Sequence, residues 1–425
     1  MPEAPAGHGA FDMNRSAVGI EAISLYCGPT VLDVRSLFEA RNLDLERFDN
    51  LMMKSRSVGL PCEDPVTNGV NAAKPIIDRL SGEEKNAIEL VIAASESGID
   101  FGKAMSTYIH DYLGLSRHCR VVEMKQACYA GTGAMQMANC FVASNTSPGA
   151  KALIIATDTS RFARNFTYAE PSQGVGSVAI LVSDRPKVME IDLGAMGYYS
   201  YEVMDTCRPV PGVETGDADL SLMAYLECYD QCFKEYCRRV QGVDVLKTFD
   251  YFAYHTPFGG MVKGAHRKLL RSAGKLPPQQ VEEDFQRRVA PSLEYCVQVG
   301  NVYSATLYFA LCGIIDHAPI DSPMRVGMFS YGSGCSSEFY SGLIQPQAKR
   351  ELGQLDIQGQ LDRRYQLNMD EYERILSLNN EWMFGVENKE VSLEGYEAIY
   401  RHFMEGRGLL VLDRVKDYHR EYRWS

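Results

Sequence analysis

Short runs of apolar residues alternate with amphipathic stretches along most of this chain, and the apolar runs are rich in β-branched and small residues. Such runs are typical of buried strands, whereas apolar positions that recur every three to four residues indicate helices. The strands predicted in this way are 18–26, 87–95, 151–156 and 175–182, and the helices are 32–41 and 101–113. Strands that alternate with helices predict a layered α/β fold.

A faint internal repeat divides the chain in two. A segment of small residues at helical spacing follows Cys128, and a second close-packed helix is predicted from Gly300 to Leu311. Each is followed by two apolar runs, which in the second half are 325–330 and 335–340. Because 425 residues exceed the usual limit of a single core, we expect two similar α/β halves packed together.

The remaining segments lie outside this repeat. Residues 1–17 are small and polar, and we expect them to be disordered. An amphipathic helix over 222–240 is inserted between the halves, and the charged tail shows helical patterns near 369–378 and 393–404. We therefore divide the chain into the N-terminus, a first half over 18–200, a second half over 201–345 and a C-terminal cap over 346–425.

Composition and charge exclude several classes of protein. The net charge of −12 argues against a nucleic-acid partner, which would require a basic face. No run is long enough for a membrane span, and the start lacks a charged segment followed by an apolar one, so we expect no membrane contact, no secretory signal and a reducing cytoplasm. The twelve cysteines form no CxxC pair, which argues against a zinc site and against a thioredoxin-like motif. Cys228, Cys232 and Cys237 follow a helical pattern without a nearby histidine and indicate core packing.

Cys128 is the first candidate for chemistry. It stands at the N-terminal end of the predicted small-residue helix, where unpaired N–H groups and the helix dipole favour a thiolate. A thiolate there suits a nucleophile that carries a covalent intermediate. The alternative is a buried free cysteine that behaves as a small apolar residue.

Glu96 and His255 are the other two candidates. Each terminates an apolar run and is followed by glycine, as in Glu96-Ser-Gly98 and His255-Thr-Pro-Phe-Gly-Gly260, which would place both side chains at strand ends facing a cleft. Taken singly, such a glutamate is more often a solvated loop residue and such a histidine more often structural.

Together these segments resemble a known family. Ala127-Cys-Tyr-x-Gly-Thr132, Glu96-Ser-Gly-x-Asp100, His255-x-Pro-Phe258 and Phe329-Ser-Tyr-Gly-Ser-Gly334 are similar to blocks of the 3-hydroxy-3-methylglutaryl (HMG) synthase family of the thiolase superfamily, in the family's order. The resemblance implies two β-α-β-α-β-α-β-β halves in an α/β/α/β/α arrangement with a C-terminal helical extension. It also implies a homodimer.

The family resemblance also implies roles for individual residues. Cys128 would accept an acetyl group, Glu96 would deprotonate its methyl, and His255 would hydrogen-bond the carbonyl of the acceptor. Further residues match family positions near the substrate or the oxyanion hole, namely Asn301, Ser333, Tyr129, Asp158 and Asp205. A partly buried Glu96 should have a raised pKa, which suits a base that acts on a weak carbon acid.

Two departures from the family pattern indicate a carrier protein as the donor. Members that use coenzyme A usually have lysines where this chain has Gly260 and Gly264, and Met204-Asp-Thr-Cys-Arg-Pro209 replaces an aromatic-rich pattern. In these features the chain resembles the synthases of polyketide β-branching, which take acetyl from a donor acyl carrier protein and add it to a β-ketoacyl chain on a polyketide synthase carrier domain. The phosphopantetheine would belong to these carriers, and no metal or cofactor of the enzyme's own is expected.

Carrier proteins are acidic, so a local basic face is expected despite the negative net charge. The residues that would supply it, on the helix after His255, are Lys263, Arg267, Lys268 and Arg271. The alternative is an ordinary solvated helix face.

Three other functions stay open from the sequence. The chain could be the mevalonate-pathway enzyme that joins acetyl-coenzyme A to acetoacetyl-coenzyme A. It could be a β-ketoacyl synthase, for which Cys128, His255 and Asn301 would suffice without Glu96. It could also be a thiolase-fold scaffold that binds carriers without catalysis, although all three catalytic positions are filled.

Overall fold

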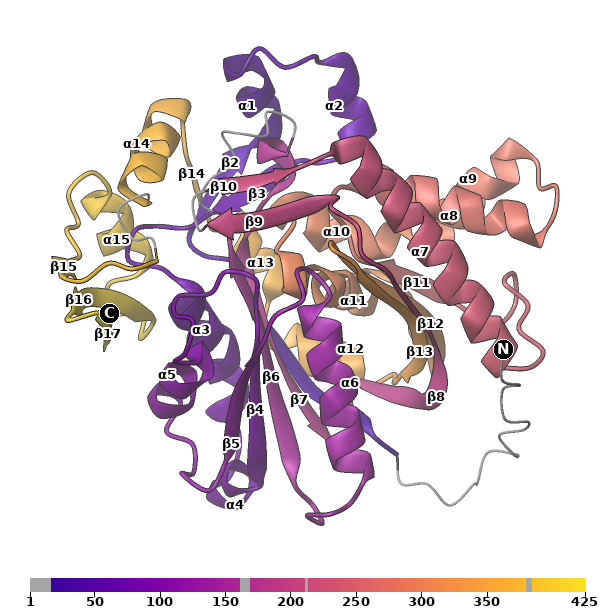
Figure 1. Cartoon of the computed structure of the whole chain (residues 1–425), viewed down its shortest axis with the longest axis horizontal. Coiled ribbons are helices and arrows are strands. Elements are labelled where there is room, and N and C mark those ends of the chain that lie inside the picture. The colour runs from indigo at the N-terminus through magenta and orange to yellow at the C-terminus, as the bar shows by residue number, and fades with distance from the viewer. Residues whose placement is uncertain (1–16, 161–168, 211–212, 380–383) are drawn as a thin grey trace.

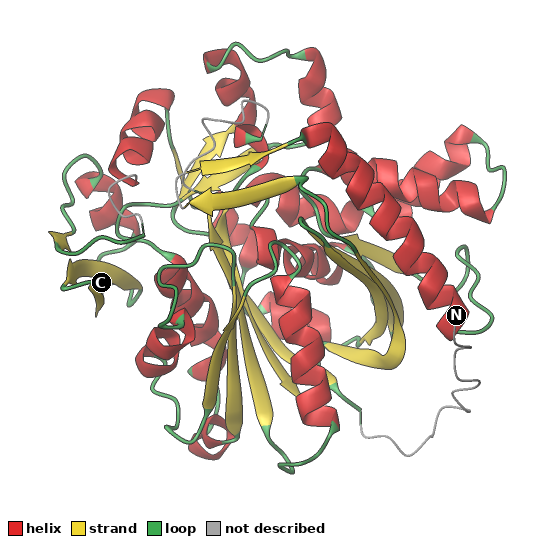
Figure 2. Cartoon of the chain, in the orientation of Figure 1, coloured by secondary structure: helices red, strands yellow, loops and turns green. Residues whose placement is uncertain are grey.

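The computed structural model describes residues 17–160, 169–210, 213–379 and 384–425. The N-terminus that we expected to be disordered spans residues 1–17, and residues 1–16 of it lie outside the described residues. A sheet of nine strands runs through the centre of the described chain (Figures 1 and 2). In spatial order its strands are β11 (Tyr251–Tyr254), β12 (Met324–Gly332), β13 (Ser336–Ile344), β8 (Met189–Ser200), β1 (Gly19–Tyr26), β7 (Val175–Ser183), β6 (Lys151–Thr159), β4 (Ile88–Ala94) and β5 (Arg120–Met124).

The strand order contains the predicted repeat. In the first half β4 pairs in parallel with β6, which is antiparallel to β7, which is antiparallel to β1. In the second half β11 pairs in parallel with β12, which is antiparallel to β13. Strand β13 is antiparallel to β8, which belongs to this half of the sheet although its residues lie within the segment 18–200. The halves meet where β1 pairs with β8. Among the described strands, β5 has no counterpart in the second half.

Alternation along the strands assigns their side chains to two cores. On β6, Ala152, Ile154 and Ala156 join the core between the halves, while Leu153 and Ile155 join the outer core. Every one of these side chains is buried, which is why the run reads as continuously apolar.

Helices fill the layers on both faces of the sheet. The helices that carry the cores are α3 (Pro65–Ile77) and α5 (Met105–Tyr112) outside the first half, α6 (Ala130–Ala143) and α11 (Thr306–His317) in the middle, and α7 (Ala218–Arg239), α8 (Gly259–Ala273), α9 (Pro278–Arg288) and α10 (Ala290–Val299) around the second half. This arrangement confirms the predicted layered α/β fold (Figure 1). Among the described residues, no helix combines the length and apolarity needed to cross a bilayer.

Several predicted helices begin elsewhere than expected because of their caps. The segment 32–41 starts as the strand β2 (Thr30–Asp33), and α1 (Val34–Ala40) begins where the Asp33 carboxylate accepts the Ser36 N–H. Helix α7 begins earlier than predicted because Asp217 caps it. The helix predicted from Gly300 begins with a short 3₁₀ turn, η3 (Tyr303–Ala305), before α11.

Shorter elements surround the upper end of the sheet in Figure 1. They are α2 (Glu46–Leu51), β3 (Ser55–Val58), the 3₁₀ turn η2 (Glu170–Ser172) and the two-stranded ribbon of β9 (Thr206–Val210) and β10 (Val213–Gly216). Helix α4 (Gly82–Asn86) precedes β4 at the opposite end. The sequence pattern did not predict the ribbon.

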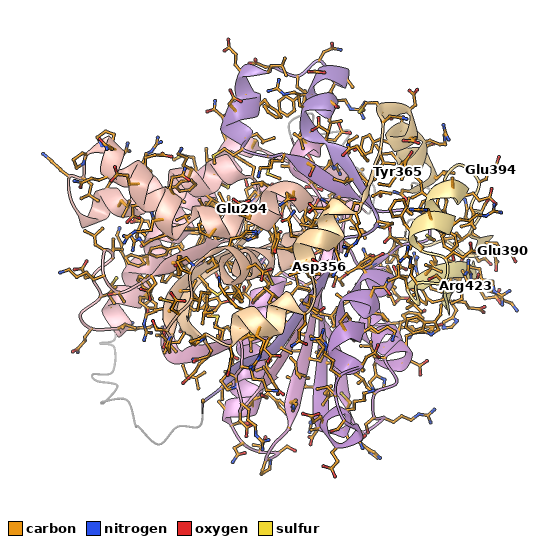
Figure 3. All side chains as sticks on the ribbon, turned by 180° about the vertical axis from the view of Figure 1, so that it is seen from behind. Glu294, Asp356, Tyr365, Glu390, Glu394 and Arg423 are labelled. Atoms are coloured by element: carbon orange, nitrogen blue, oxygen red, sulfur yellow. The ribbon has the colours of Figure 1, made fainter. Side chains whose placement is uncertain are left out.

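The C-terminal cap contains strands as well as the predicted helices. Its elements are α12 (Ala348–Gly353), α13 (Ile357–Asp362), β14 (Tyr365–Gln366), α14 (Met369–Asn379), β15 (Lys389–Glu390), α15 (Glu397–Phe403), β16 (Leu410–Lys416) and β17 (His419–Trp424). The buried Asp64 at the start of α3 accepts hydrogen bonds from Arg420 at 3.1 Å and from the Tyr422 hydroxyl at 2.8 Å, which fixes the cap to the first half. Figure 3 shows Glu390, Glu394 and Arg423 at its outer surface. The four proposed segment boundaries stay predictions.

Candidate active site

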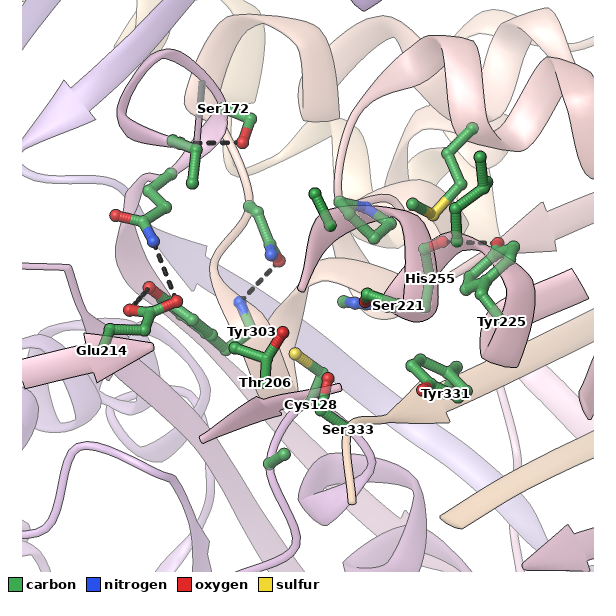
Figure 4. Close-up of a pocket in the computed structure, with 18 of the residues that line it drawn as sticks. Cys128, Ser172, Thr206, Glu214, Ser221, Tyr225, His255, Tyr303, Tyr331 and Ser333 are labelled. Atoms are coloured by element: carbon green, nitrogen blue, oxygen red, sulfur yellow. Dashed lines mark hydrogen bonds between the residues drawn. The ribbon is translucent and has the colours of Figure 1, made fainter. Parts of the chain in front are cut away.

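A cavity of about 1160 Å³ opens where the two halves meet at the ends of their strands. Five of the residues singled out from the sequence line it, namely Glu96, Cys128, His255, Asn301 and Ser333. They come from both halves of the fold, and Figure 4 shows Cys128, His255 and Ser333 around the same space.

Cys128 lies in the turn between β5 and α6. The preceding residue, Ala127, has a φ of +44°, a left-handed conformation that bends the chain sharply before the helix. Helix α6 can approach η3 closely because Gly131 lacks a side chain, since a Cβ there would lie 2.2 Å from the Ser304 carbonyl oxygen. The turn leaves Cys128 half-buried, with its sulfur 3.9 Å from Oε2 of Glu96.

The expectation that the helix terminus would favour a Cys128 thiolate is wrong for this structure. Burial raises the pKa of the thiol well above its ordinary value, and the nearby carboxylates of Glu96, Asp158 and Glu214 raise it further. Only Arg208 among the main influences opposes them. Desolvation and the neighbouring carboxyl groups therefore outweigh the favourable effect of the helix terminus, and Cys128 stays a protonated thiol beside Glu96.

The position of Glu96 is set by the buried carboxylate of Asp158 at the end of β6. Oδ1 of Asp158 accepts the N–H groups of Glu96 at 2.9 Å and Ser97 at 3.1 Å, and Oδ2 accepts the N–H of Ser304 at 3.0 Å. Asp158 thus ties the turn after β4 to η3 of the second half. It does not line the cavity and acts on the site through Glu96.

Glu96 is also held by a charged pair that sequence reasoning missed. One guanidinium nitrogen of Arg208 lies 3.4 Å from Oε1 of Glu96 and 3.1 Å from Oε2 of Glu214. Burial raises the pKa of Glu96 to about 8, with the Asp158 and Glu214 charges adding to the rise and Arg208 opposing it. The oppositely charged residues six positions apart were the available signal, but only the β9–β10 ribbon brings them together.

His255 continues the ladder of β11 beyond its end. Its N–H donates to the Phe329 carbonyl at 2.7 Å, and its own carbonyl accepts the Tyr225 hydroxyl at 2.8 Å. The side chain is buried, and this burial lowers the imidazole pKa to about 3. His255 is therefore a neutral ring at physiological pH and can donate one hydrogen bond.

Asn301 and Asp205 organise the backbone of the second half. Oδ1 of Asn301 accepts the Tyr303 N–H and the Thr306 hydroxyl, both at 2.9 Å, so its amide nitrogen is the group that it can offer to the cavity. Asp205 accepts the Gly334 N–H at 2.9 Å and the Tyr331 hydroxyl at 2.6 Å. It fixes the turn that carries Ser333 and does not line the cavity.

Tyr129 points away from the cavity. Its hydroxyl donates to Oε2 of the buried Glu338 at 2.8 Å, and Gln136 of α6 donates to the other oxygen of that carboxylate. The sequence placed Tyr129 among the residues that support the substrate, but the structure places it in the packing of α6 against β13. Its influence on the site runs through the backbone next to Cys128.

Comparisons with known proteins agree with this geometry. The model of the hydroxymethylglutaryl-coenzyme A synthase N-terminal part matches residues 15–187, and that of the C-terminal part matches 209–281 and 271–420. The chain belongs to the hydroxymethylglutaryl-coenzyme A synthase family. It is therefore a synthase that forms carbon–carbon bonds by condensing acyl groups.

Individual relatives of this synthase fall into two groups. It is 53% identical to the polyketide biosynthesis 3-hydroxy-3-methylglutaryl-ACP synthase PksG of Bacillus subtilis, over 96% of this chain and 99% of that one. The crystal structure of the curacin biosynthetic pathway HMG synthase in complex with acetyl donor-ACP matches with a TM-score of 0.94 and 54% identity, covering 96% of this chain and all of the other. The hydroxymethylglutaryl-CoA synthase of Enterococcus faecalis is 31% identical over 85% of this chain and 91% of its own.

The glycines that replace the expected lysines differ in their surroundings. A Cβ on Gly260 would lie 1.9 Å from the Asn50 carbonyl oxygen, because α2 packs directly on the start of α8. Gly264 has open space around it. The synthase therefore excludes any side chain at the first position and leaves the second vacant.

The basic residues of α8 are not equally available. Arg267 and Arg271 are exposed, whereas Lys263 pairs with Glu282 at 2.9 Å and the Lys268 amine donates to the Leu226 carbonyl at 2.9 Å. The start of the same helix, at Met261, lines the cavity. Within the described part of the chain, Arg267 and Arg271 are thus the members of the predicted docking set that have no ion-pair or hydrogen-bond partner.

The cysteine cluster is structural, as predicted. Cys228 and Cys232 are buried in the core between α7 and the second half, and Cys237 packs against it. Among the residues that the structure describes, no group of histidine, cysteine, aspartate and glutamate is arranged to hold a metal ion.

Proposed function

We propose that this synthase acts in polyketide β-branching, joining an acetyl group from a donor acyl carrier protein to the β-ketone of an acyl chain on a second carrier. The observation that carries the proposal is the contact between the Cys128 sulfur and Oε2 of Glu96, 3.9 Å apart, in a cavity shared with the neutral His255. A nucleophile, a base and a hydrogen-bond donor are the groups that an acetyl condensation requires. Two relatives that share more than half of their residues with this synthase, a 3-hydroxy-3-methylglutaryl-ACP synthase and an HMG synthase in complex with acetyl donor-ACP, support the carrier-dependent reaction.

The first step transfers the acetyl group to Cys128. The sulfur attacks the carbonyl carbon of the donor thioester, and the bond from that carbon to the carrier sulfur breaks. Glu96 is placed to take the thiol proton and to pass it to the departing carrier thiol. This path suits a cysteine whose pKa is raised, because the thiolate need form only as the bond is made.

The second step forms the carbon–carbon bond. Glu96 removes a proton from the acetyl methyl, and the resulting carbanion attacks the β-carbonyl carbon of the acceptor. His255 donates a hydrogen bond to the carbonyl oxygen as it becomes an alkoxide, which then takes up a proton to give the hydroxyl group. The Glu96 pKa of about 8 makes it a stronger base than an ordinary carboxylate, which suits a weak carbon acid.

The last step releases the product. Water adds its hydroxyl to the acyl carbon on Cys128, the carbon–sulfur bond breaks and the sulfur regains a proton. In the turn after β12 the N–H groups of Gly334 and Cys335 are engaged by Asp205 and by the Tyr201 carbonyl. We assign the N–H of Ser333 as the oxyanion donor in this turn, with Asn301 supporting the acceptor.

The distinction between a carrier and coenzyme A rests on α8. The Asn50 backbone leaves no room for a lysine at Gly260, so a basic contact to the nucleotide end of coenzyme A is excluded there. Arg267 and Arg271 instead present positive charge on the exposed face of a helix that begins at the cavity. This face complements an acidic carrier protein.

Acetyl loading of Cys128 tests the function directly. Intact-protein mass spectrometry after mixing with acetyl-carrier protein should show an acetyl gain on the wild type and none on Cys128→Ser. Acetyl-coenzyme A should load more slowly. Equal or faster loading from coenzyme A would favour the hydroxymethylglutaryl-coenzyme A reaction, and no loading from either donor would refute both.

Carrier docking is tested by charge reversal. Arg267→Glu with Arg271→Glu should weaken the apparent affinity for the donor carrier and make the residual binding less sensitive to salt. Arg407→Glu, an exposed arginine on the cap, is the matched control. An unchanged affinity in the double variant would refute this docking face.

A homodimer and a cytoplasmic location complete the proposal. The edge strand β5 exposes Val122, and α6 exposes Met137, with exposed fractions of 44% and 59%. Exposed apolar side chains on neighbouring elements suit burial against a second copy. We propose no cofactor of the enzyme's own, since the phosphopantetheine is carried by the partner proteins.

A further inference from the structure

The β9–β10 ribbon inserts a charged cluster into the cavity wall beside Glu96. Cys207 pairs with Thr215 and Thr206 with Gly216 across the ribbon, which places Arg208 and Glu214 on neighbouring positions of the two strands. Gly216 allows the ribbon to close tightly, because a Cβ there would lie 2.1 Å from the Asp205 carbonyl oxygen. Arg208 on β9 is therefore held beside Glu214 on β10 by the pairing of the two strands.

Arg208 has closer and more numerous contacts with Glu214 and its neighbours than with Glu96. Its guanidinium lies 3.1 Å from Glu214 and 5.3 Å from the centre of the Tyr303 ring. Glu214 in turn accepts hydrogen bonds from the Tyr303 hydroxyl at 3.2 Å and from Gln173 at 3.1 Å. Glu214 accepts from Arg208, Tyr303 and Gln173, and these three hydrogen bonds hold the guanidinium in place.

The same guanidinium nitrogen of Arg208 also contacts Glu96. Oε1 lies 3.4 Å from the nitrogen of Arg208, while Oε2 faces the Cys128 sulfur. The two oxygens of one carboxylate therefore have separate partners, and the contact to Arg208 fixes the rotation that aims Oε2 at the sulfur. An acetyl group attached to that sulfur would have its methyl within reach of Oε2.

We propose that Arg208 is a positioning residue that aims Glu96 at the acetyl group on Cys128, and that Glu214 tunes it by sharing its charge. This inference rests on the proposed function for its chemistry but not for its geometry. One cation shared between two carboxylates orients the base without neutralising it fully. If Arg208 paired with Glu96 alone, it would make that carboxylate a weaker base.

Removal of the Arg208 charge and removal of the Glu214 charge should shift the pH dependence of the site in opposite directions. The groups that face Glu96 are Arg208 from β9, Glu214 from β10, Asp158 from β6, Tyr303 from η3 and the Cys128 thiol. Loss of the Arg208 charge should raise the pKa of Glu96 and of Cys128, while loss of the Glu214 charge should lower both. A merely structural role would not give opposite shifts.

The primary test measures hydrogen exchange at the acetyl methyl. Acetylated enzyme is placed in deuterated buffer over a range of pH, and the mass gain of the acetyl group is followed. Arg208→Met should still load acetyl on Cys128 but exchange about 100-fold more slowly, which is within the usual contribution of an acid–base group. Its acid limb should move to higher pH, that of Glu214→Gln should move to lower pH, and Arg208→Lys should recover part of the rate.

A second readout does not depend on the proposed function. The rate at which iodoacetamide alkylates Cys128 reports the titration of the thiol beside Glu96, whatever the natural substrate is. The alkylation profile should move to higher pH in Arg208→Met and to lower pH in Glu214→Gln. Arg325→Met breaks a partly exposed ion pair with Asp192 at the opposite end of β12 and should move neither profile.

The outcomes separate the two proposals. If the wild type loads no acetyl, the proposed function fails, and the alkylation profiles alone decide the role of Arg208. If the profiles of the two variants are unchanged or move in the same direction, the inference is overturned even when the wild type turns over. If Arg208→Met does not fold, Arg208→Lys and Glu214→Gln decide, since a normal exchange rate and profile in both would also overturn it.

Discussion

The two halves of this synthase repeat one strand pattern, but the side chains that they contribute to the cavity have pKa values shifted in opposite directions. Glu96 follows β4 and His255 follows β11, and each of these strands pairs in parallel with the strand that enters the next turn of the site, β6 or β12. Charged groups surround Glu96, whereas burial alone dominates at His255. The pKa of Glu96 rises to about 8, and that of His255 falls to about 3.

This difference shows that equivalent strand ends in two repeated halves can hold side chains with different catalytic functions. Both shifts begin with desolvation, which disfavours the charged form of either group. For a carboxyl group the consequence is a stronger base, and for an imidazole it is a neutral hydrogen-bond donor. The two side chains therefore suit removal of a proton on one side of the cavity and stabilisation of a developing alkoxide on the other.

Among the substitutions that test this difference between the halves, Glu96→Gln should have the largest effect. The amide cannot take a methyl proton, so we expect condensation to fall by about 10³-fold or more, towards the upper end of the contribution of a general base. Hydrogen exchange at the acetyl methyl should be lost with it. Condensation at the wild-type rate would contradict the role of base and favour a mechanism that uses Cys128, His255 and Asn301.

His255→Gln should separate the two halves of the chemistry. Loss of a donor to the developing oxyanion typically costs about 10²–10³-fold, so condensation should slow by that factor. Exchange at the acetyl methyl of loaded enzyme should persist, because Glu96 is unchanged. Parallel loss of exchange and condensation would show instead that His255 acts on the acetyl group.

The opposite pKa shifts also predict opposite effects of pH on stability. Glu96 has a folded-state pKa above its ordinary value of 4.5, so its contribution is full below that value and is lost as pH rises through about 8. His255 has a folded-state pKa below its ordinary value of 6.5, so its contribution is present above 6.5 and is lost as pH falls through about 3.

Urea unfolding at several pH values measures both effects. Relative to the wild type, Glu96→Gln should gain stability as pH rises from about 5 to about 8, and His255→Gln should gain as pH falls from about 6.5 to about 4. An exposed substitution, Glu405→Gln, serves as the control for a change of one carboxylate. A constant difference from the wild type at all pH values in either variant would contradict the assigned pKa shift.

Much of the fold and of the site was predictable from local pattern. The apolar runs at 151–156 and 175–182 are strands because both of their faces are buried. Glu96 and His255 stand out because each ends an apolar run, and Cys128 stands out because it precedes a segment of small residues. Arg208 and Glu214 were not predicted, because an ordinary surface ribbon would show the same charges. The thiolate expected at Cys128 was wrong because a local rule, the helix dipole, cannot count the distant carboxylates that the fold assembles.

The smallest effects are expected in the helices that follow the two strand ends. Helix α5 begins at Met105, well beyond Glu96, whereas α8 begins at Gly259, directly after the turn of His255. The second half therefore needs glycine where α8 meets α2, and Gly260→Ala should destabilise the protein by about 1–3 kcal/mol because its Cβ would overlap the Asn50 carbonyl. Gly264→Ala, one turn further, meets open space and should stabilise by about 0.5–1 kcal/mol. Thermal unfolding of the two variants measures both changes in stability. A stabilised Gly260→Ala would show that α2 does not pack against α8 as described, and a lysine at position 260 would then no longer be excluded.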